Sequence, residues 1–177
     1  MLVPIWAATW ELECCQLEAE AGKEWKVPVA FRPGRDPWWV TSYGATATQE
    51  QRQLGIARLD ATAVEVDEDF GQQLMTAGPI SFRAETGVRP GPIEGRLSLD
   101  AHVDPNPFRG RDLVRGVAER VQIVPLRFVK KTDRVMVPAE QLDAVEARST
   151  TQRGDVLRWR DEGLVDVDLL VWLKVGD

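Results

Sequence analysis

The side chains of this sequence that could bind a soft metal ion or act in thiol chemistry are Cys14, Cys15 and His102, the one histidine. A zinc site usually has four such ligands, or three and a water molecule, at set spacings. We expect Cys14 and Cys15 to lie in an extended strand, where adjacent side chains point to opposite faces. Two thiols that point apart make a poor metal site. The sequence therefore predicts buried, reduced, structural thiols and neither a metal ion nor another cofactor.

His102 could also act as a general base, because Asp100 and Asp104 share its face of a predicted strand. No clear nucleophile lies nearby in the sequence, and a solvated polar face that contains one histidine is the simpler interpretation. The sequence therefore predicts no catalytic residue. A hydrolase-like enzyme that uses His102 and a cysteine stays open as an alternative, because it depends on whether the fold brings the two segments together.

Arginine is concentrated in the segment that follows Phe108. A groove for single-stranded nucleic acid combines such cations with aromatic rings on which bases stack. The formal net charge of −6 disfavours a general binder of the phosphate backbone. A small nucleic-acid-binding barrel is the second hypothesis for function, and its candidate residues are Phe108, Arg109, Arg111 and Arg115, with an exposed Trp38 or Trp39.

Trp38 and Trp39 are adjacent and follow a turn-rich segment. In the short strand that we expect there, the two rings point to opposite faces, so either one ring is exposed or the second also packs under a loop. Exposed aromatic side chains mark interaction surfaces. The first hypothesis is therefore a non-enzymatic module that binds another protein as one component of a larger assembly, through Trp38 and Trp39 or through an open strand edge.

The segments that must position these side chains have apolar residues at every second position. This alternation is typical of strands that bury one face. It runs through residues 2–14, 25–31, 93–103 and 165–175. Roughly nine short strands predict an all-β, mainly antiparallel fold, either a small barrel or two packed small barrels. One or two short helices are expected, one of them at about 49–54 after a capping box of Thr48 and Gln51.

The chain of 177 residues is long enough to bury a core without cross-links. We expect one β-rich domain over residues 1–177, with a Gly- and Pro-rich loop between possible halves at 1–86 and 93–177. The apolar beginning has no Lys or Arg before it and ends at Glu11, so it predicts neither a signal peptide nor a membrane span. Together with reduced thiols, this favours a cytoplasmic protein without a membrane partner.

The opening of the chain also resembles an uncharacterised actinobacterial domain family. The resemblance lies in Trp10, the Cys14-Cys15 pair, Gly22 and Trp25, and it extends to Gly95-Arg96-Leu97, Asp100 to His102 and Gly116 to Val121. The sequence departs from the family at Gln16, where glycine is usual. The family has no assigned activity, so the resemblance implies a related fold and no particular reaction.

Overall fold

The computed structural model describes residues 1–102, 106–152 and 164–176, so Asp104 lies outside the described residues. The fold is mainly β, as the alternation predicts, and its helices are short. The strands are β1 (Leu2–Ala8), β2 (Glu24–Pro33), β3 (Ala57–Asp67), β4 (Gln72–Ala77), β5 (Ile80–Glu85), β6 (Gly91–Leu99), β7 (Leu113–Thr132), β8 (Val135–Gln141), β9 (Val145–Ala147) and β10 (Leu164–Lys174). The helices are α1 (Thr9–Cys14), α2 (Trp38–Tyr43), α3 (Gln49–Gln53) and a 3₁₀ turn at Thr150–Gln152.

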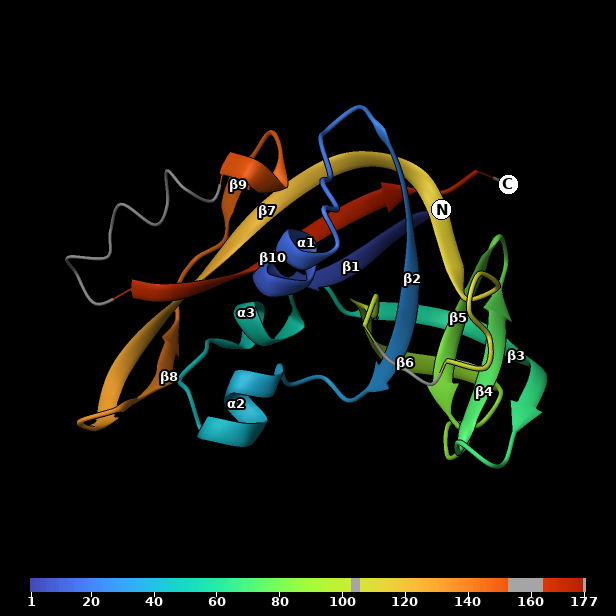
Figure 1. Ribbon diagram of the computed structural model, residues 1–177, viewed down its shortest axis with the longest axis horizontal. Coiled ribbons are helices and arrows are strands. Elements are labelled where there is room, and N and C mark those ends of the chain that lie inside the picture. The colour runs from blue at the N-terminus through green and yellow to red at the C-terminus, as the bar shows by residue number, and fades with distance from the viewer. Residues whose placement is uncertain (103–105, 153–163, 177) are drawn as a thin grey trace.

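All ten strands belong to one mixed sheet. Most neighbouring strands are antiparallel, but β1 pairs with β6 and β2 pairs with β5 in parallel. The hydrogen-bonded pairs close into two circuits that share β2 and β6. One circuit passes through β1, β6, β2, β7 and β10, and the other through β6, β3, β4, β5 and β2. Figure 1 shows the long, curved β7 above the helices, with β3, β4 and β5 gathered at one end.

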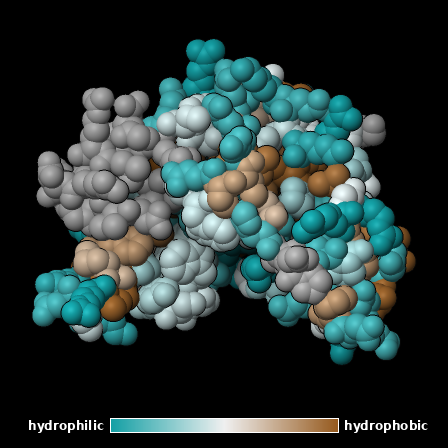
Figure 2. Space-filling model, in the orientation of Figure 1, coloured by the Kyte–Doolittle hydropathy of each residue, from teal (hydrophilic) through white to brown (hydrophobic). Residues whose placement is uncertain are grey.

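The hydrophobic core lies on the inner faces of these strands. One continuous cluster draws on both circuits, and its fully buried members include Ile5, Phe82, Leu97, Val121 and Leu169. Alternate residues of a strand point to the same face, so the two-residue periodicity of the sequence supplies this core directly. Figure 2 shows that the lower edge of the molecular surface is concave, with α2 on one side and the β4–β5 hairpin on the other.

Residues 9–14 form α1, so the prediction that the first strand continues to Cys14 is wrong. The segment contains no Gly or Pro, and its Leu and Glu residues are good helix formers. Residues two apart lie on opposite sides of a helix, whereas they share a face of a strand. Trp10 is accordingly 58% exposed while Leu12 is buried. Alternation through residue 14 would bury Trp6, Trp10 and Leu12 on one face, but only Trp6 and Leu12 are buried.

The second helix, α2, replaces the short strand that was expected at Trp38 and Trp39. Pro37 precedes the helix, and Gly44, with a φ of 68°, ends it in the left-handed conformation that glycine adopts without strain. The predicted helix after Thr48 is confirmed as α3. The Thr48 hydroxyl accepts a hydrogen bond from the Gln51 amide, and the Gln51 side chain accepts one from the Thr48 amide.

The polar face of β6 is not the solvated face that the alternation predicts. Arg96 is only 7% exposed, because the segments around Arg35 and Arg52 cover it and accept its hydrogen bonds through their backbone carbonyls. Beyond the end of β6, Asp100 is also buried. Both faces of β6 are therefore covered, and the polar side chains of Arg96 and Asp100 lie inside the protein. Among the described residues, no helix is long and apolar enough to cross a membrane.

Candidate functional site

A pocket of about 660 Å³ lies between the end of β1, α1, α2 and β6. It forms because the chain leaves the sheet at Ala8 and again at Pro33 to make the two short helices. Its walls therefore come from segments far apart in the sequence. The side chains with which they line it include Trp6, Trp10, Glu11, Arg32, Trp38, Trp39, Arg96, Asp100, His102 and Asp168.

Three tryptophans form a connected aromatic wall. The ring of Trp39 packs edge-on against Trp6 and Trp38, with centroids 5.6 Å from each. Each indole N–H donates a hydrogen bond to a fixed acceptor, which orients the ring. The acceptors are the Gly55 carbonyl for Trp6, Asp168 Oδ2 for Trp38 and Gln141 Oε1 for Trp39. The wall is thus held in place before any ligand binds.

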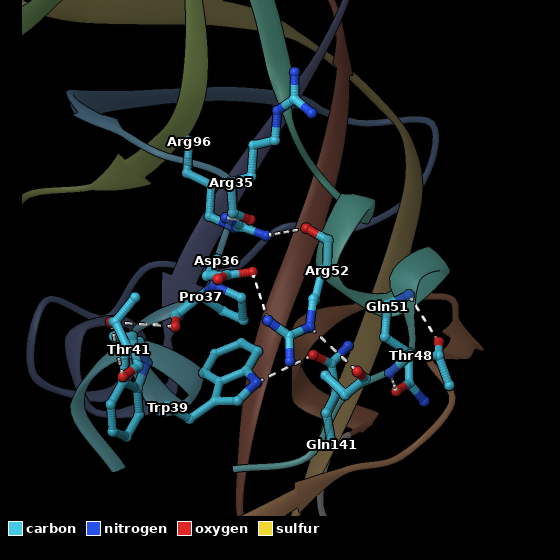
Figure 3. A network of polar contacts seen from close by, with 12 residues as sticks. Arg35, Asp36, Pro37, Trp39, Thr41, Thr48, Gln51, Arg52, Arg96 and Gln141 are labelled. Atoms are coloured by element: carbon cyan, nitrogen blue, oxygen red, sulfur yellow. Dashed lines mark hydrogen bonds and ion pairs between the residues drawn. The ribbon is translucent and has the colours of Figure 1, made fainter. Parts of the chain in front are cut away.

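Arg96 brings a positive charge to this wall. Its guanidinium carbon lies 5.7 Å from the Trp6 ring centroid, and its Nη2 donates to the Arg52 carbonyl at 2.7 Å (Figure 3). Its Nε has no hydrogen-bond acceptor, and Arg96 has no ion pair within the described part of the chain. Burial lowers the pKa of Arg96 to about 10, against the opposing effect of the Asp36 charge. The Asp36 carboxylate forms its ion pair with the neighbouring Arg52, as Figure 3 shows.

Carboxylates approach the pocket from α1 and from the end of β6. Asp100 forms a buried ion pair with Arg83, and the side chains are 7% and 4% exposed. Glu11 is also buried. Burial raises the pKa of Glu11 to about 7, with a further contribution from the Asp100 charge and opposition from amide hydrogen bonds and Arg32. Glu11 therefore carries only part of its charge at neutral pH.

The fold brings Cys14, Cys15 and His102 together at the end of α1. His102 Nε2 lies 2.5 Å from Cys14 Sγ and 3.0 Å from Cys15 Sγ. The prediction that the two thiols point apart is wrong, because Cys14 is the last residue of a helix and Cys15 caps it, so neither lies in a strand. They are not buried either: Cys14 is exposed and Cys15 half-buried. The ring of Trp10 covers the imidazole, with centroids 5.2 Å apart.

The residues proposed for nucleic-acid binding do not form an open stacking groove. Phe108 is fully buried, so its ring has no exposed face for a base. Arg111 pairs with Glu65 and Arg115 pairs with Glu24. Arg109 also has an interaction partner. The hydrogen bonds from arginine lower the pKa of Glu24 and Glu65, as expected for carboxylates held in ion pairs.

Of the two alternatives left open for the tryptophan pair, the structure has the one with an exposed ring, on a helix and not on the expected strand. Trp38 is 44% exposed at the pocket, and Trp39 is buried behind it. Alternation does not identify Trp6, Glu11 and Arg96 as site residues, since it assigns Trp6 to the core and the other two to solvent. A helical pattern after Ala8 is the sequence signal that points to the site, because a helix there ends β1 and packs near the end of β6.

Comparisons of this chain with models of protein families, with curated proteins and with solved structures give no match.

Proposed function

We propose that this chain is a binding module whose pocket takes a small organic acid with a flat apolar body. The observation that carries the proposal is Arg96, a buried cation without an ion pair among the described residues, at the wall of a pocket of about 660 Å³. Pockets of this size bind small molecules through apolar walls and a few fixed polar groups. The indole faces of Trp6 and Trp38 would contact the flat body, and Arg96 would attract the acid group.

The acidic side chains of the pocket do not oppose this assignment, because they are already engaged. Asp36 pairs with Arg52, and Asp100 pairs with Arg83. Asp168 accepts the hydrogen bond of Trp38 Nε1. The remaining carboxylate, Glu11, carries only part of its charge at pH 7, because its pKa is raised to about 7, and it loses that part at lower pH. Asp168 keeps its charge, but the lining holds two cations, Arg32 and Arg96, against Asp168 and a partly charged Glu11, so the charge left for a ligand to balance is slightly positive.

The test uses two probes of one shape, naphthalene-2-carboxylate and the neutral naphthalene-2-methanol, titrated into the protein by calorimetry. We expect the acid to bind more tightly than the alcohol. Arg96→Gln should weaken binding of the acid by at least about tenfold, because a charge-assisted interaction is lost, and should leave the alcohol unchanged. Trp38→Ala should weaken both probes, because both lose the same apolar contact.

Arg115→Gln is the matched control, since it removes an arginine that is exposed and paired with Glu24, away from the pocket. Its affinity for both probes should equal that of the unmodified protein. Failure of both probes to bind, or equal affinity for acid and alcohol, would show that the pocket does not recognise organic acids.

A second candidate is the protein-interaction module that the sequence favours. The observation in its support is a group of exposed aromatic rings: Trp38 and Tyr43 are 44% and 50% exposed, and their centroids lie 5.7 Å apart. Such rings are frequent anchors at interfaces. The expected result is a stoichiometric partner that co-purifies with the protein and is lost with Trp38→Ala. Phe70→Ala, which removes an exposed ring after β3, should retain it. Loss of the partner in both variants would contradict the assignment.

The other hypotheses have weaker support. Arg111 and Arg115 form ion pairs with glutamates, which leaves less positive charge to bind nucleic acid. A steep salt dependence of oligonucleotide binding would favour the nucleic-acid hypothesis. A hydrolase that uses His102 is supported by the contact of this residue with both cysteines. Burial raises the pKa of the Cys15 thiol, however, and so disfavours the thiolate nucleophile.

We also propose that the two circuits of strands are two small packed barrels, and that the free thiols belong to a reducing, cytoplasmic compartment.

A further inference from the structure

Two thiols and one imidazole nitrogen converge where α1 ends. Cys14 is the last residue of α1 and Cys15 caps it. Gln16 then adopts a φ of 53°, which turns the chain away and leaves both sulfur atoms on the side of His102. The three ligand atoms, Cys14 Sγ, Cys15 Sγ and His102 Nε2, all lie within 4.8 Å of one another. No other group of three such ligands occurs in the described ranges of the chain.

The contacts within this group cannot all be hydrogen bonds at once. A neutral imidazole offers one acceptor lone pair on Nε2, and each thiol has one S–H to donate. Cys14 and Cys15 therefore compete for this acceptor, and Cys14 has a second one in the Glu11 carbonyl, 3.7 Å from its Sγ. A cation that replaces both thiol protons would bind the two sulfur atoms and Nε2 at once.

We propose that Cys14, Cys15 and His102 bind one zinc ion through two thiolates and the imidazole Nε2, with the fourth position open to water. Sulfur ligands favour zinc over magnesium or calcium, which prefer oxygen. Two thiolates and one histidine, with a free fourth position, are a ligand set that zinc accepts. Binding releases the two thiol protons to solvent and involves no change in oxidation state. Zinc binding at this site does not depend on which ligand the pocket takes.

The ligands reach zinc geometry through small movements. At usual zinc–ligand distances, a sulfur and a nitrogen ligand stand about 3.6 Å apart in a tetrahedral site. The observed separations of His102 Nε2 from the sulfurs of Cys14 and Cys15 are 2.5 and 3.0 Å, so the thiols must move outward by roughly 1 Å or less. Cys14 is exposed and has room to move. Trp10, stacked on the imidazole with an interplanar angle of 31°, holds His102 in place.

The first experiment titrates the reduced, metal-free chain with Co²⁺ as an optical probe and then with Zn²⁺. We expect one Co²⁺ per chain, a sulfur-to-cobalt charge-transfer band, and the strong visible absorption of tetrahedral cobalt. Zn²⁺ should displace Co²⁺, and Zn²⁺ binding to the metal-free chain should release two protons for each ion. Absence of the charge-transfer band, or a stoichiometry other than one, would overturn the proposal.

The decisive variant is His102→Ala, because two adjacent thiols could hold a soft ion alone. We expect His102→Ala to lower Zn²⁺ affinity by at least about tenfold, as loss of one ligand of three requires. Unchanged affinity would overturn the three-ligand site. Cys14→Ser tests the same site with little risk to folding, since Cys14 is exposed. It should abolish the charge-transfer contribution of one thiolate, and an unchanged spectrum would also overturn the proposal.

Glu13→Gln is the matched control, because it removes a negative charge beside Cys14 and no proposed ligand. Its Zn²⁺ affinity should stay within about twofold of the unmodified chain, as expected for a surface charge at moderate salt. A loss as large as that of His102→Ala would mean that general electrostatic attraction holds the ion, which overturns the site.

Discussion

Replacing Asp100 by Asn is expected to destabilise the protein strongly, because it leaves the charge of Arg83 buried. Both side chains of this ion pair are almost fully inaccessible, at 7% and 4% exposure, and Arg83 Nη1 already lacks a hydrogen-bond partner. Removing one partner of a buried pair usually costs about 3–5 kcal/mol. Asn keeps the shape of Asp, so the loss reports charge and not a cavity.

The magnitude can be checked by urea unfolding and by thermal melting. For a chain of 177 residues, a loss of about 3–5 kcal/mol corresponds to a fall in melting temperature of roughly 6–20 °C. The double variant Arg83→Met, Asp100→Leu removes both charges. Replacing both partners of a buried pair by apolar residues is often neutral or stabilising. We therefore expect the double variant to be more stable than Asp100→Asn.

Two results would refute this reasoning. A loss below about 1 kcal/mol for Asp100→Asn would mean that solvent screens the pair as it screens surface ion pairs. A double variant that loses as much stability as Arg83→Met and Asp100→Leu lose separately, added together, would mean that the two charges do not interact. The unfolding slope with urea must stay constant for either comparison to be valid.

Three further predictions follow from single positions and from the surface ion pairs. Gln16→Gly should stabilise the protein by about 1 kcal/mol in urea unfolding, because glycine takes the φ of 53° without strain; a loss would contradict this. Gly55→Ala should destabilise by more than about 2 kcal/mol, since its Cβ would lie 2.5 Å from Trp6 Nε1 at a φ of 65°; an unchanged urea midpoint would contradict the close packing. Arginine partners lower the pKa of Glu24 and Glu65 from 4.5 in the folded state. The two ion pairs therefore contribute to the free energy of unfolding above pH 4.5, and this contribution is lost as the pH falls through the folded pKa values. Urea midpoints at falling pH should show this loss, and about 0.5 M salt should reduce it; a midpoint that rises below pH 4.5 would contradict it.

The sequence predicts the strands well because burial acts on each residue locally. Alternation in β6 and β10 places residues such as Leu97 and Leu169 on the inner face, where the structure has them. The capping box before α3 is equally local, and it forms as predicted. Patterns of this kind need no knowledge of distant segments.

The candidate site is less predictable because it depends on how distant segments meet. The alternation of Trp6, Trp10 and Leu12 fits a strand, yet the chain turns into α1 after Ala8. That single change of periodicity decides whether Cys14 and Cys15 diverge or converge. The burial of Arg96 depends on the carbonyls of Arg35 and Arg52, which no local pattern around β6 reveals.

The pairing of β1 with β10 also has a consequence for how the protein folds. Strand β1 finds its antiparallel partner at the other end of the chain, from Leu2 opposite Lys174 to Ala8 opposite Asp168. Contacts between such distant segments require the closure of a very long loop, which slows folding. During synthesis, β6 can pair with β1 first, at Ile5 and Trp6, and the longer pairing with β10 forms only after residues 164–174 have emerged. In that interval the other edge of β1 has no partner strand, and such an unpaired edge is prone to aggregation and is a binding site for chaperones.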